Sequence, residues 1–204
     1  MENVTPLRRF FRFSSTVLLA LVVGACSSPP VPVDTFYNLN TSGNSVSAVT
    51  ARLGGNLEVS RFRAEGVVNG RAIIYRSSAI EQRQYSYHYW AEPPAVMFQR
   101  SFIDALRNSK LFDSVAGPEM RAGRDYELIG TLRRLEHVIG GGSPRVLVEV
   151  DVSLRRVSGG QTLLVKTYVK ERLAGSSVVA GVESISIVLG QIIEEVVRDA
   201  VAAG

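Results

Sequence analysis

The sequence predicts an α+β domain in which two helices pack on a mainly antiparallel sheet of about six strands. Three long strand candidates follow one another late in the chain, at residues 126–138, 145–157 and 162–173, with glycine-rich joints between them. A stretch from residue 94 and the C-terminal stretch carry apolar residues at helical spacing. The expected order is up to four strands, a helix, three strands and a second helix.

The first 25 residues predict a lipoprotein signal peptide. Three arginines precede an apolar run that ends in Val23-Gly24-Ala25-Cys26. A basic start, a short apolar core and small residues before the cleavage point are typical of such signals. The last four residues resemble a bacterial lipobox, which implies that the mature chain starts at Cys26 with lipid on its sulfur and its amino group. Ser27 follows where inner-membrane lipoproteins usually carry Asp, so the resemblance implies the periplasmic face of the outer membrane.

Two other interpretations of this segment are weaker. A transmembrane helix needs roughly 20 apolar residues, and residues 14–23 supply about half of that. A core helix with a buried cysteine could not continue through the Ser-Ser-Pro-Pro-Val-Pro that follows. With three prolines and no periodicity, residues 26–34 are expected to form a flexible tether to a domain at 35–204.

Composition narrows the function classes. Removal of residues 1–25 leaves 179 residues, the size of one domain. The signal peptide carries +2 of the formal net charge of +4, so the mature chain is near +2. No dense Lys/Arg patch is present, and nucleic acid is therefore not an expected partner. Cys26 is the only cysteine, which leaves no disulfide within the domain.

The first half of the domain predicts short strands. Residues 35–39 and 72–76 are rich in β-formers, and residues 57–62 alternate apolar and polar side chains. Residues 82–89 form a further, unusually polar strand candidate. Residues 40–56 are rich in Ser, Gly and Asn and are expected to form a loop.

Both helices are predicted from apolar periodicity. The first opens at Pro93-Pro94, ends near Asn108 and presents Phe98, Phe102 and Leu106 on one face. The stripe on the second helix consists of Ile185, Val188, Leu189, Ile192, Ile193, Val196 and Val197. Its opposite face, expected to be solvated, carries Gln191, Glu194, Glu195, Arg198 and Asp199.

A search for catalytic chemistry finds little. Only two histidines occur, His88 and His137, without metal-ligand spacing, and each is expected to be an ordinary polar residue on a strand. Gly140-Gly141-Gly142 lacks the Gly-Lys-Ser/Thr of a phosphate loop and predicts a hairpin turn. The sequence therefore predicts no catalytic residue, no metal and no cofactor, and a protein that is not an enzyme.

One aromatic stretch has two open interpretations. Tyr85, Tyr87, Tyr89 and Trp90 follow one another closely, interleaved with polar residues. They could simply pack on a sheet face, or they could contact a partner, since Tyr, Trp and Arg anchor interfaces. A stacking platform for single-stranded nucleic acid would not fit a periplasmic address. The candidate contact residues are Tyr75, Arg76, Tyr85, Tyr87, Tyr89 and Trp90.

Several stretches resemble one known family. They are Phe36–Leu39, Gly70–Arg76, Tyr85–Pro94 and Met97–Leu106. Together with the lipobox and the tether they resemble the ABC-type transport auxiliary lipoproteins, the PqiC-like family. The resemblance implies a non-enzymatic part of a lipid transport system, in which an inner-membrane ABC transporter works with an MCE-domain protein that bridges the periplasm.

The leading hypothesis is an outer-membrane lipoprotein that docks such an MCE-domain protein. A periplasmic lipid carrier, with an acyl chain between helix and sheet, is the first alternative. A structural envelope-assembly lipoprotein is the second. Homo-oligomers are compatible with each. The transported lipid and the direction of transport stay open.

Overall fold

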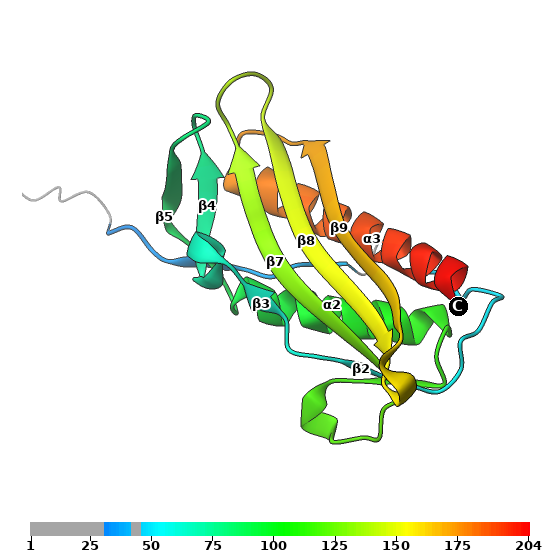
Figure 1. Cartoon of the computed structure of the whole chain (residues 1–204). Helices are drawn as coiled ribbons and strands as arrows, with labels where there is room; N and C mark the ends of the chain where they lie inside the picture. The colour runs from blue at the N-terminus through cyan, green and yellow to red at the C-terminus, as the bar shows by residue number, and fades with distance from the viewer. Residues whose placement is uncertain (1–30, 42–45) are drawn as a thin grey trace, which may run out of the picture. The chain divides into compact units, whose positions relative to one another are not determined.

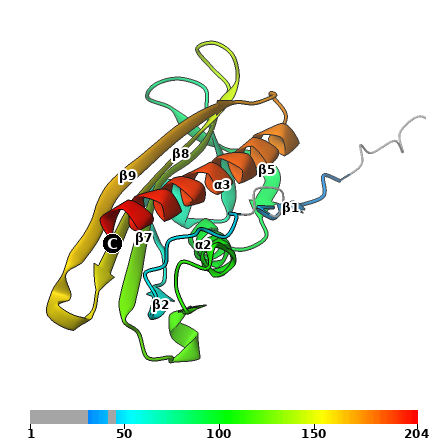
Figure 2. The same ribbon diagram turned by 90° about the vertical axis from the view of Figure 1, so that its right-hand side faces the viewer.

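Strand β7 (Tyr126–Val138) is the centre of the sheet, and every other strand joins it directly or through one or two neighbours. The computed structural model describes residues 31–41 and 46–204, and Asp34–Gly204 form one compact unit. Helices α2 and α3 cover one face of the twisted sheet, and the other face is open (Figures 1 and 2). The remaining strands are β1 (Thr35–Tyr37), β2 (Asn56–Val59), β3 (Arg63–Ala64), β4 (Ala72–Arg76), β5 (Gln82–Trp90), β6 (Ser114–Ala116), β8 (Arg145–Arg156) and β9 (Thr162–Leu173).

On one side, β7 belongs to the meander that the sequence predicts. It pairs antiparallel with β8 along its whole length, and β8 pairs antiparallel with β9. Gly141 and Gly142 both have positive φ values in the β7–β8 joint, which is the conformation that glycine adopts at least cost. The predicted hairpin turn is therefore present at this position.

On its other side, β7 pairs with β2, β3 and β4 in parallel. Two further parallel pairs join β1 to β5 and β2 to β6, so five of the eight strand pairs in the described part of the chain are parallel. The α+β class holds, but a mainly antiparallel sheet of about six strands is not confirmed, since nine strands are present. The additional strands, β3 and β6, have two and three residues, too few to show a period of two.

Helix α2 (Pro94–Ser109) begins with Pro93 at its N-cap and Pro94 in its first turn, where the missing N–H group would have no partner within the helix. Phe98 and Phe102 are fully buried against the sheet. The helix ends at Lys110, whose φ of 59° places it in the left-handed region that usually holds glycine.

Helix α3 (Val178–Ala203) begins at Ser177, whose hydroxyl accepts a hydrogen bond from the backbone N–H of Ala180. Its apolar stripe packs on the alternate valines of β8, and side chains such as Val188 and Val150 have no exposed surface. The predicted polar face is only partly solvated. Glu195 and Asp199 bind lysines of β9, since Lys166 Nζ lies 3.0 Å and 2.8 Å from their carboxylates.

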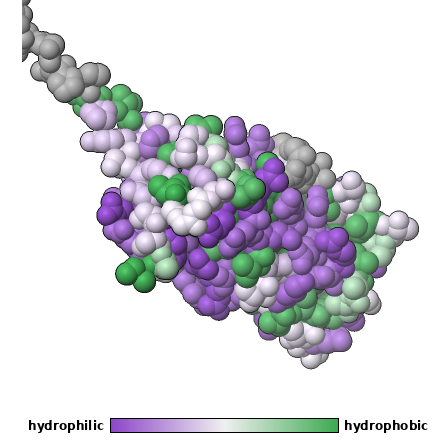
Figure 3. Space-filling view, turned by 90° about the horizontal axis from the view of Figure 1, so that it is seen from above, coloured by the Kyte–Doolittle hydropathy of each residue, from purple (hydrophilic) through white to green (hydrophobic). Residues whose placement is uncertain are grey.

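The end of the molecule that carries the β4–β5 and β7–β8 connections is mainly hydrophilic. In Figure 3 the hydrophobic side chains on this surface stand apart from one another among polar ones. Ile80, at the turn between β4 and β5, is 97% exposed. Single exposed apolar side chains are common on soluble surfaces.

Candidate functional site

The six candidate contact residues lie on one hairpin, formed by β4 and β5. Residues on β4 oppose residues on β5 in antiparallel register, for example Tyr75 opposite Arg83. The hairpin joins the sheet through Tyr75 and Arg76, which pair with the end of β7. In the part of the chain that the structure describes, only the three-residue strand β1 lies beyond β5. The hairpin is therefore close to one edge of the sheet.

Arg76 fastens the hairpin to β7. Its Nε and Nη2 atoms each donate a hydrogen bond of 2.8 Å to the carboxylate of Glu136, whose side chain is 1% exposed. Gln82 and Arg134 donate to the same carboxylate. Burial acts to raise the pKa of Glu136, but the hydrogen bonds from Arg76 and Arg134 outweigh it and hold the pKa below its usual value. The interior partner of Arg76 is thus an ionised carboxylate.

Tyr85 lies on the helix-covered side of the hairpin, beside a buried histidine. Its hydroxyl is 2.9 Å from Nδ1 of His137, and its ring centroid is 4.5 Å from that of Tyr75. Burial raises the pKa of Tyr85 to about 12. His137 Nε2 lies 2.9 Å from the carbonyl oxygen of Gly175. His137 thereby links the hairpin to the turn before α3.

Both histidines lie on strands, as predicted. Burial lowers the pKa of His137, and the hydrogen bond to Gly175 offsets this only in part. His88 is half-buried, and its Nδ1 is 2.8 Å from the hydroxyl of Tyr37. The rings of His88 and His137 flank Tyr85 at centroid distances of 6.3 Å and 6.0 Å. Each histidine therefore has a structural partner.

The candidate residues differ in their exposure. Trp90 is 2% exposed, and Tyr75, Arg76 and Tyr85 are half-buried. Tyr87 is 45% exposed and has a φ of 63°, a left-handed conformation in which a side chain such as tyrosine is rare. The hairpin therefore contributes both packing residues and surface residues.

Two residues outside the predicted set extend the surface. Phe36 on β1 is 55% exposed, and its ring lies 6.0 Å from that of Tyr89. The guanidinium carbon of Arg71 lies 5.3 Å from the centre of the Phe36 ring, and its Nε donates to the carbonyl oxygen of Trp90. Phe36 and Arg71 belong to family-like stretches of the sequence, which could have indicated them as contact residues. That they lie side by side depends on the parallel pairing of β1 with β5. We call Phe36, Arg71, Tyr87 and Tyr89 the aromatic edge.

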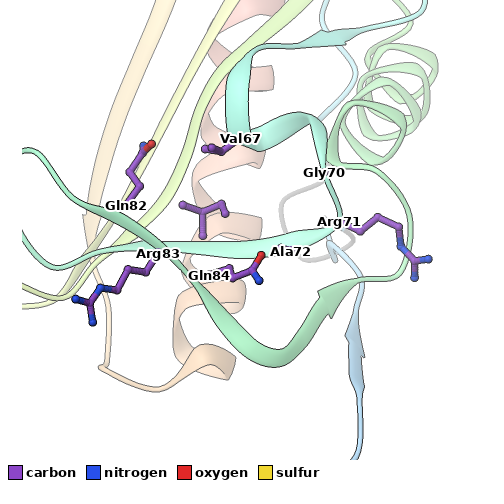
Figure 4. A pocket seen from close by; sticks show the side chains of 8 residues that line it. Val67, Gly70, Arg71, Ala72, Gln82, Arg83 and Gln84 are labelled. Atoms are coloured by element: carbon purple, nitrogen blue, oxygen red, sulfur yellow. The ribbon is translucent and has the colours of Figure 1, made fainter.

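A pocket of about 640 Å³ opens beside the hairpin (Figure 4). Ile74 and Ala72 line it from β4, and Gln82 and Gln84 from β5, while Val67 lies across from them. The lining residues are Val67, Gly70, Arg71, Ala72, Ile74, Gln82, Arg83 and Gln84. The pocket thus has an apolar floor, with amide and guanidinium groups around it.

Within residues 31–41 and 46–204, no group of three or more His, Cys, Asp or Glu side chains is placed to hold a metal ion. In the same residues no helix combines the length and hydropathy that a membrane span requires. Cys26 and the predicted signal peptide lie outside the described residues.

A family model described as the ABC-type transport auxiliary lipoprotein component matches residues 37–197. The chain belongs to this family. The match includes the whole β4–β5 hairpin but only Tyr37 of β1, so Phe36 lies just outside it. The family is described as an auxiliary component and not as an enzyme. A search of curated proteins found no match.

Solved structures share the fold. Protein XCC0632 from Xanthomonas campestris, a DUF330 protein, is 23% identical with a TM-score of 0.71, over 80% of this chain and 92% of that chain. Hypothetical protein CT253 from Chlamydia trachomatis is 10% identical with a TM-score of 0.52, over 74% and 99%. A PelC dodecamer from Paraburkholderia phytofirmans is 15% identical with a TM-score of 0.50, over 76% and 94%.

Proposed function

We propose that this protein is a lipid-anchored adaptor of an ABC-type lipid transport system, and that it docks the MCE-domain protein that spans the periplasm. The family match over residues 37–197 is the observation that carries the proposal. An auxiliary component must join the transporter complex through a surface. The described part of the chain offers such a surface at the aromatic edge.

The anchor is the lipidated Cys26. In this proposal residues 1–25 are removed as a signal peptide, residues 26–34 form the tether, and residues 35–204 form the domain. One acyl chain gives an association constant of only about 10⁴ M⁻¹ for a membrane, so stable anchoring needs the additional chains that a lipoprotein carries. Ser27 directs the protein to the outer membrane, where it faces the periplasm.

The aromatic edge is the proposed contact with the MCE-domain protein. Aromatic and Arg side chains supply most hot spots at protein interfaces, and Phe36, Arg71 and Tyr87 are all exposed. Trp90 and Tyr85 support this surface from within the domain, and Arg76 with Tyr75 attaches it to β7. A homo-oligomer that meets a multimeric conduit is part of the proposal, and PelC, a relative in fold, forms a dodecamer.

A lipid carrier is the alternative that has an observation in its favour, namely the pocket of about 640 Å³ beside the hairpin. The predicted location between helix and sheet is less favourable, since Val188, Leu189 and Ile192 of α3 are fully buried there. For a structural envelope lipoprotein, the discriminating observation is the gene neighbourhood. The adaptor proposal expects genes for an MCE-domain protein and an ABC permease nearby.

The test is a crosslinked pull-down of the tagged full chain from membranes, with partners identified by mass spectrometry. Wild type should recover an MCE-domain protein, and Cys26→Ala should lose it together with the membrane fraction. Tyr87→Asn should reduce recovery at least tenfold without loss of folding, because asparagine tolerates the left-handed backbone. The matched control is Val179→Asn, an exposed position on α3. Recovery of lipid or unrelated envelope proteins alone would overturn the adaptor proposal.

A further inference from the structure

Strand β9 is a long edge strand. It has 12 residues and, within the described chain, pairs with β8 alone (Figure 1). In an antiparallel pair, every second residue directs its N–H and C=O groups away from the partner strand. One side of β9 therefore presents a row of backbone groups that can pair with another strand.

Some of the devices with which proteins protect an edge are missing from β9. It contains no proline, and its one register irregularity lies at its first residues. Its two lysines are engaged elsewhere, since Lys166 binds Glu195 and Asp199 of α3, and Lys170 lies 2.8 Å from Glu195. Both lysines are thus directed to the helix-covered face.

The open face of β9 carries an apolar row. Val165, Val169 and Leu173 are 73%, 55% and 72% exposed, and their spacing by four residues puts them on the same face of the strand. A long and apolar exposed edge is a site at which strands of other molecules add. We propose that β9 pairs antiparallel with β9 of a second copy of this chain, across a two-fold axis at Thr167.

The charges on β9 select this occupant and this register. In a two-fold antiparallel pair, the residue on the axis faces the same residue of the second copy. A residue that precedes the axis by some number of positions faces the residue that follows the axis by the same number in the second copy. An axis at Thr167 places Val165 of each copy opposite Val169 of the other copy. It also places the two Thr167 residues opposite each other. On the other face, Lys166 then lies opposite Tyr168, so no two cations face each other.

The registers centred on Lys166, Tyr168 and Val169 bring cations together. An axis at Lys166 places that lysine opposite itself, and an axis at Tyr168 places Lys166 opposite Lys170. An axis at Val169 places Lys166 opposite Arg172. Like charges directly opposite one another destabilise a strand pair, whereas β-branched pairs stabilise it. An axis at Val165 or earlier avoids facing cations but pairs only residues 162–168 or fewer. Among the registers without facing cations, the axis at Thr167 therefore pairs the longest stretch, residues 162–172.

A thiol placed on the axis tests the register. Facing residues in an antiparallel pair have Cα atoms about 4.5–5.5 Å apart, within the range that a disulfide spans. In isolated membranes treated with copper phenanthroline as oxidant, Thr167→Cys should give a disulfide-linked band at twice the chain mass. Wild type, which retains Cys26, and Ile80→Cys at the β4–β5 turn should give none. Absence of the Thr167→Cys band, or an equally strong Ile80→Cys band, would overturn the proposal.

Charge exchange tests the facing pair. Added to Thr167→Cys, the changes Val165→Lys and Val169→Lys together should reduce the linked band at least tenfold, since lysines then face lysines. The combination of Val165→Lys with Val169→Glu should restore it, because each lysine then faces a glutamate. Both positions are exposed, so neither pair of changes disturbs the core. A linked band of equal strength with lysine or with glutamate at position 169 would contradict this register. The result is independent of the pull-down, because the aromatic edge is not part of β9.

Discussion

Arg76 and Glu136 form a two-pronged ion pair that joins β4 to β7, with both hydrogen bonds 2.8 Å long. The carboxylate is 1% exposed and the Arg76 side chain 21% exposed. The cost of removing one member of a buried pair exceeds the net stability that the pair supplies, because the other charge stays buried.

Arg76→Ala should therefore destabilise the domain by about 3 kcal/mol, since Glu136 keeps only Gln82 and Arg134. Urea unfolding followed by circular dichroism measures the change. Arg83→Ala is the matched control on the same hairpin, because Arg83 pairs with Glu81 at the surface, and its stability should stay close to wild type. Equal losses for the two variants would contradict the structural role of Arg76.

The buried His137 should make stability depend on pH. Because burial lowers its pKa in the folded state, the unfolded chain, with a pKa of about 6.5, binds the proton first as pH falls. The contribution of neutral His137 to the free energy of unfolding is complete above about pH 6.5. It is lost as the pH falls from there to the lowered pKa of the folded state. Unfolding free energies measured between pH 7.5 and pH 5 should show a smaller decrease for His137→Gln than for wild type. If His88→Gln flattened the profile equally, the effect would not belong to His137.

Gly181 on α3 lies against the His137 ring, where a side chain would not fit without a shift. A β-carbon at position 181 would lie 2.8 Å from Nδ1 of His137, and that ring is fixed by Tyr85 and Gly175. Gly181→Ala gains about 1 kcal/mol of helix propensity but loses about 1–3 kcal/mol to the close contact. Thermal unfolding should show a net destabilisation of about 1 kcal/mol. Gly123→Ala, where no atom lies within 4 Å, should be neutral.

Lys110 closes α2 in a left-handed conformation, with a φ of 59°. Glycine adopts this conformation without the steric cost that a β-carbon brings. Lys110→Gly should therefore stabilise the domain by about 1 kcal/mol in urea unfolding. Lys110→Ala removes the same side chain but retains the β-carbon, so it should give no such gain. A gain for alanine as large as for glycine would refute the backbone explanation.

Periodicity predicts the long elements well. The predicted bounds 72–76, 126–138 and 162–173 are those of β4, β7 and β9. Local pattern is sufficient there because each strand alternates over enough residues to reveal its buried side. The parallel pairs of β7 with β2, β3 and β4 depend on contacts between distant residues, which no local pattern contains.

The candidate site is predictable only in part. Family-like motifs identify the hairpin, but the sequence does not separate Trp90, which is buried, from Tyr87, which is exposed. In the sequence, Glu136 has the place of a solvent-facing polar residue in an alternating strand. Only the structure shows that its side chain is buried beneath Arg76. Phe36 joins the surface because β1 pairs with β5, which places it beside Tyr89, 53 residues further along the chain.

The central position of β7 governs the order in which the chain can fold. Strands β2, β3 and β4 are made first, but the strand they pair with ends only at Val138. Until that residue emerges, β1, β4 and β5 can pair with one another but cannot join the central strand, and that step depends on distant contacts, which form slowly. The sheet can therefore be completed only after the chain has been made as far as Val138, so its last connections join residues that are far apart in the sequence.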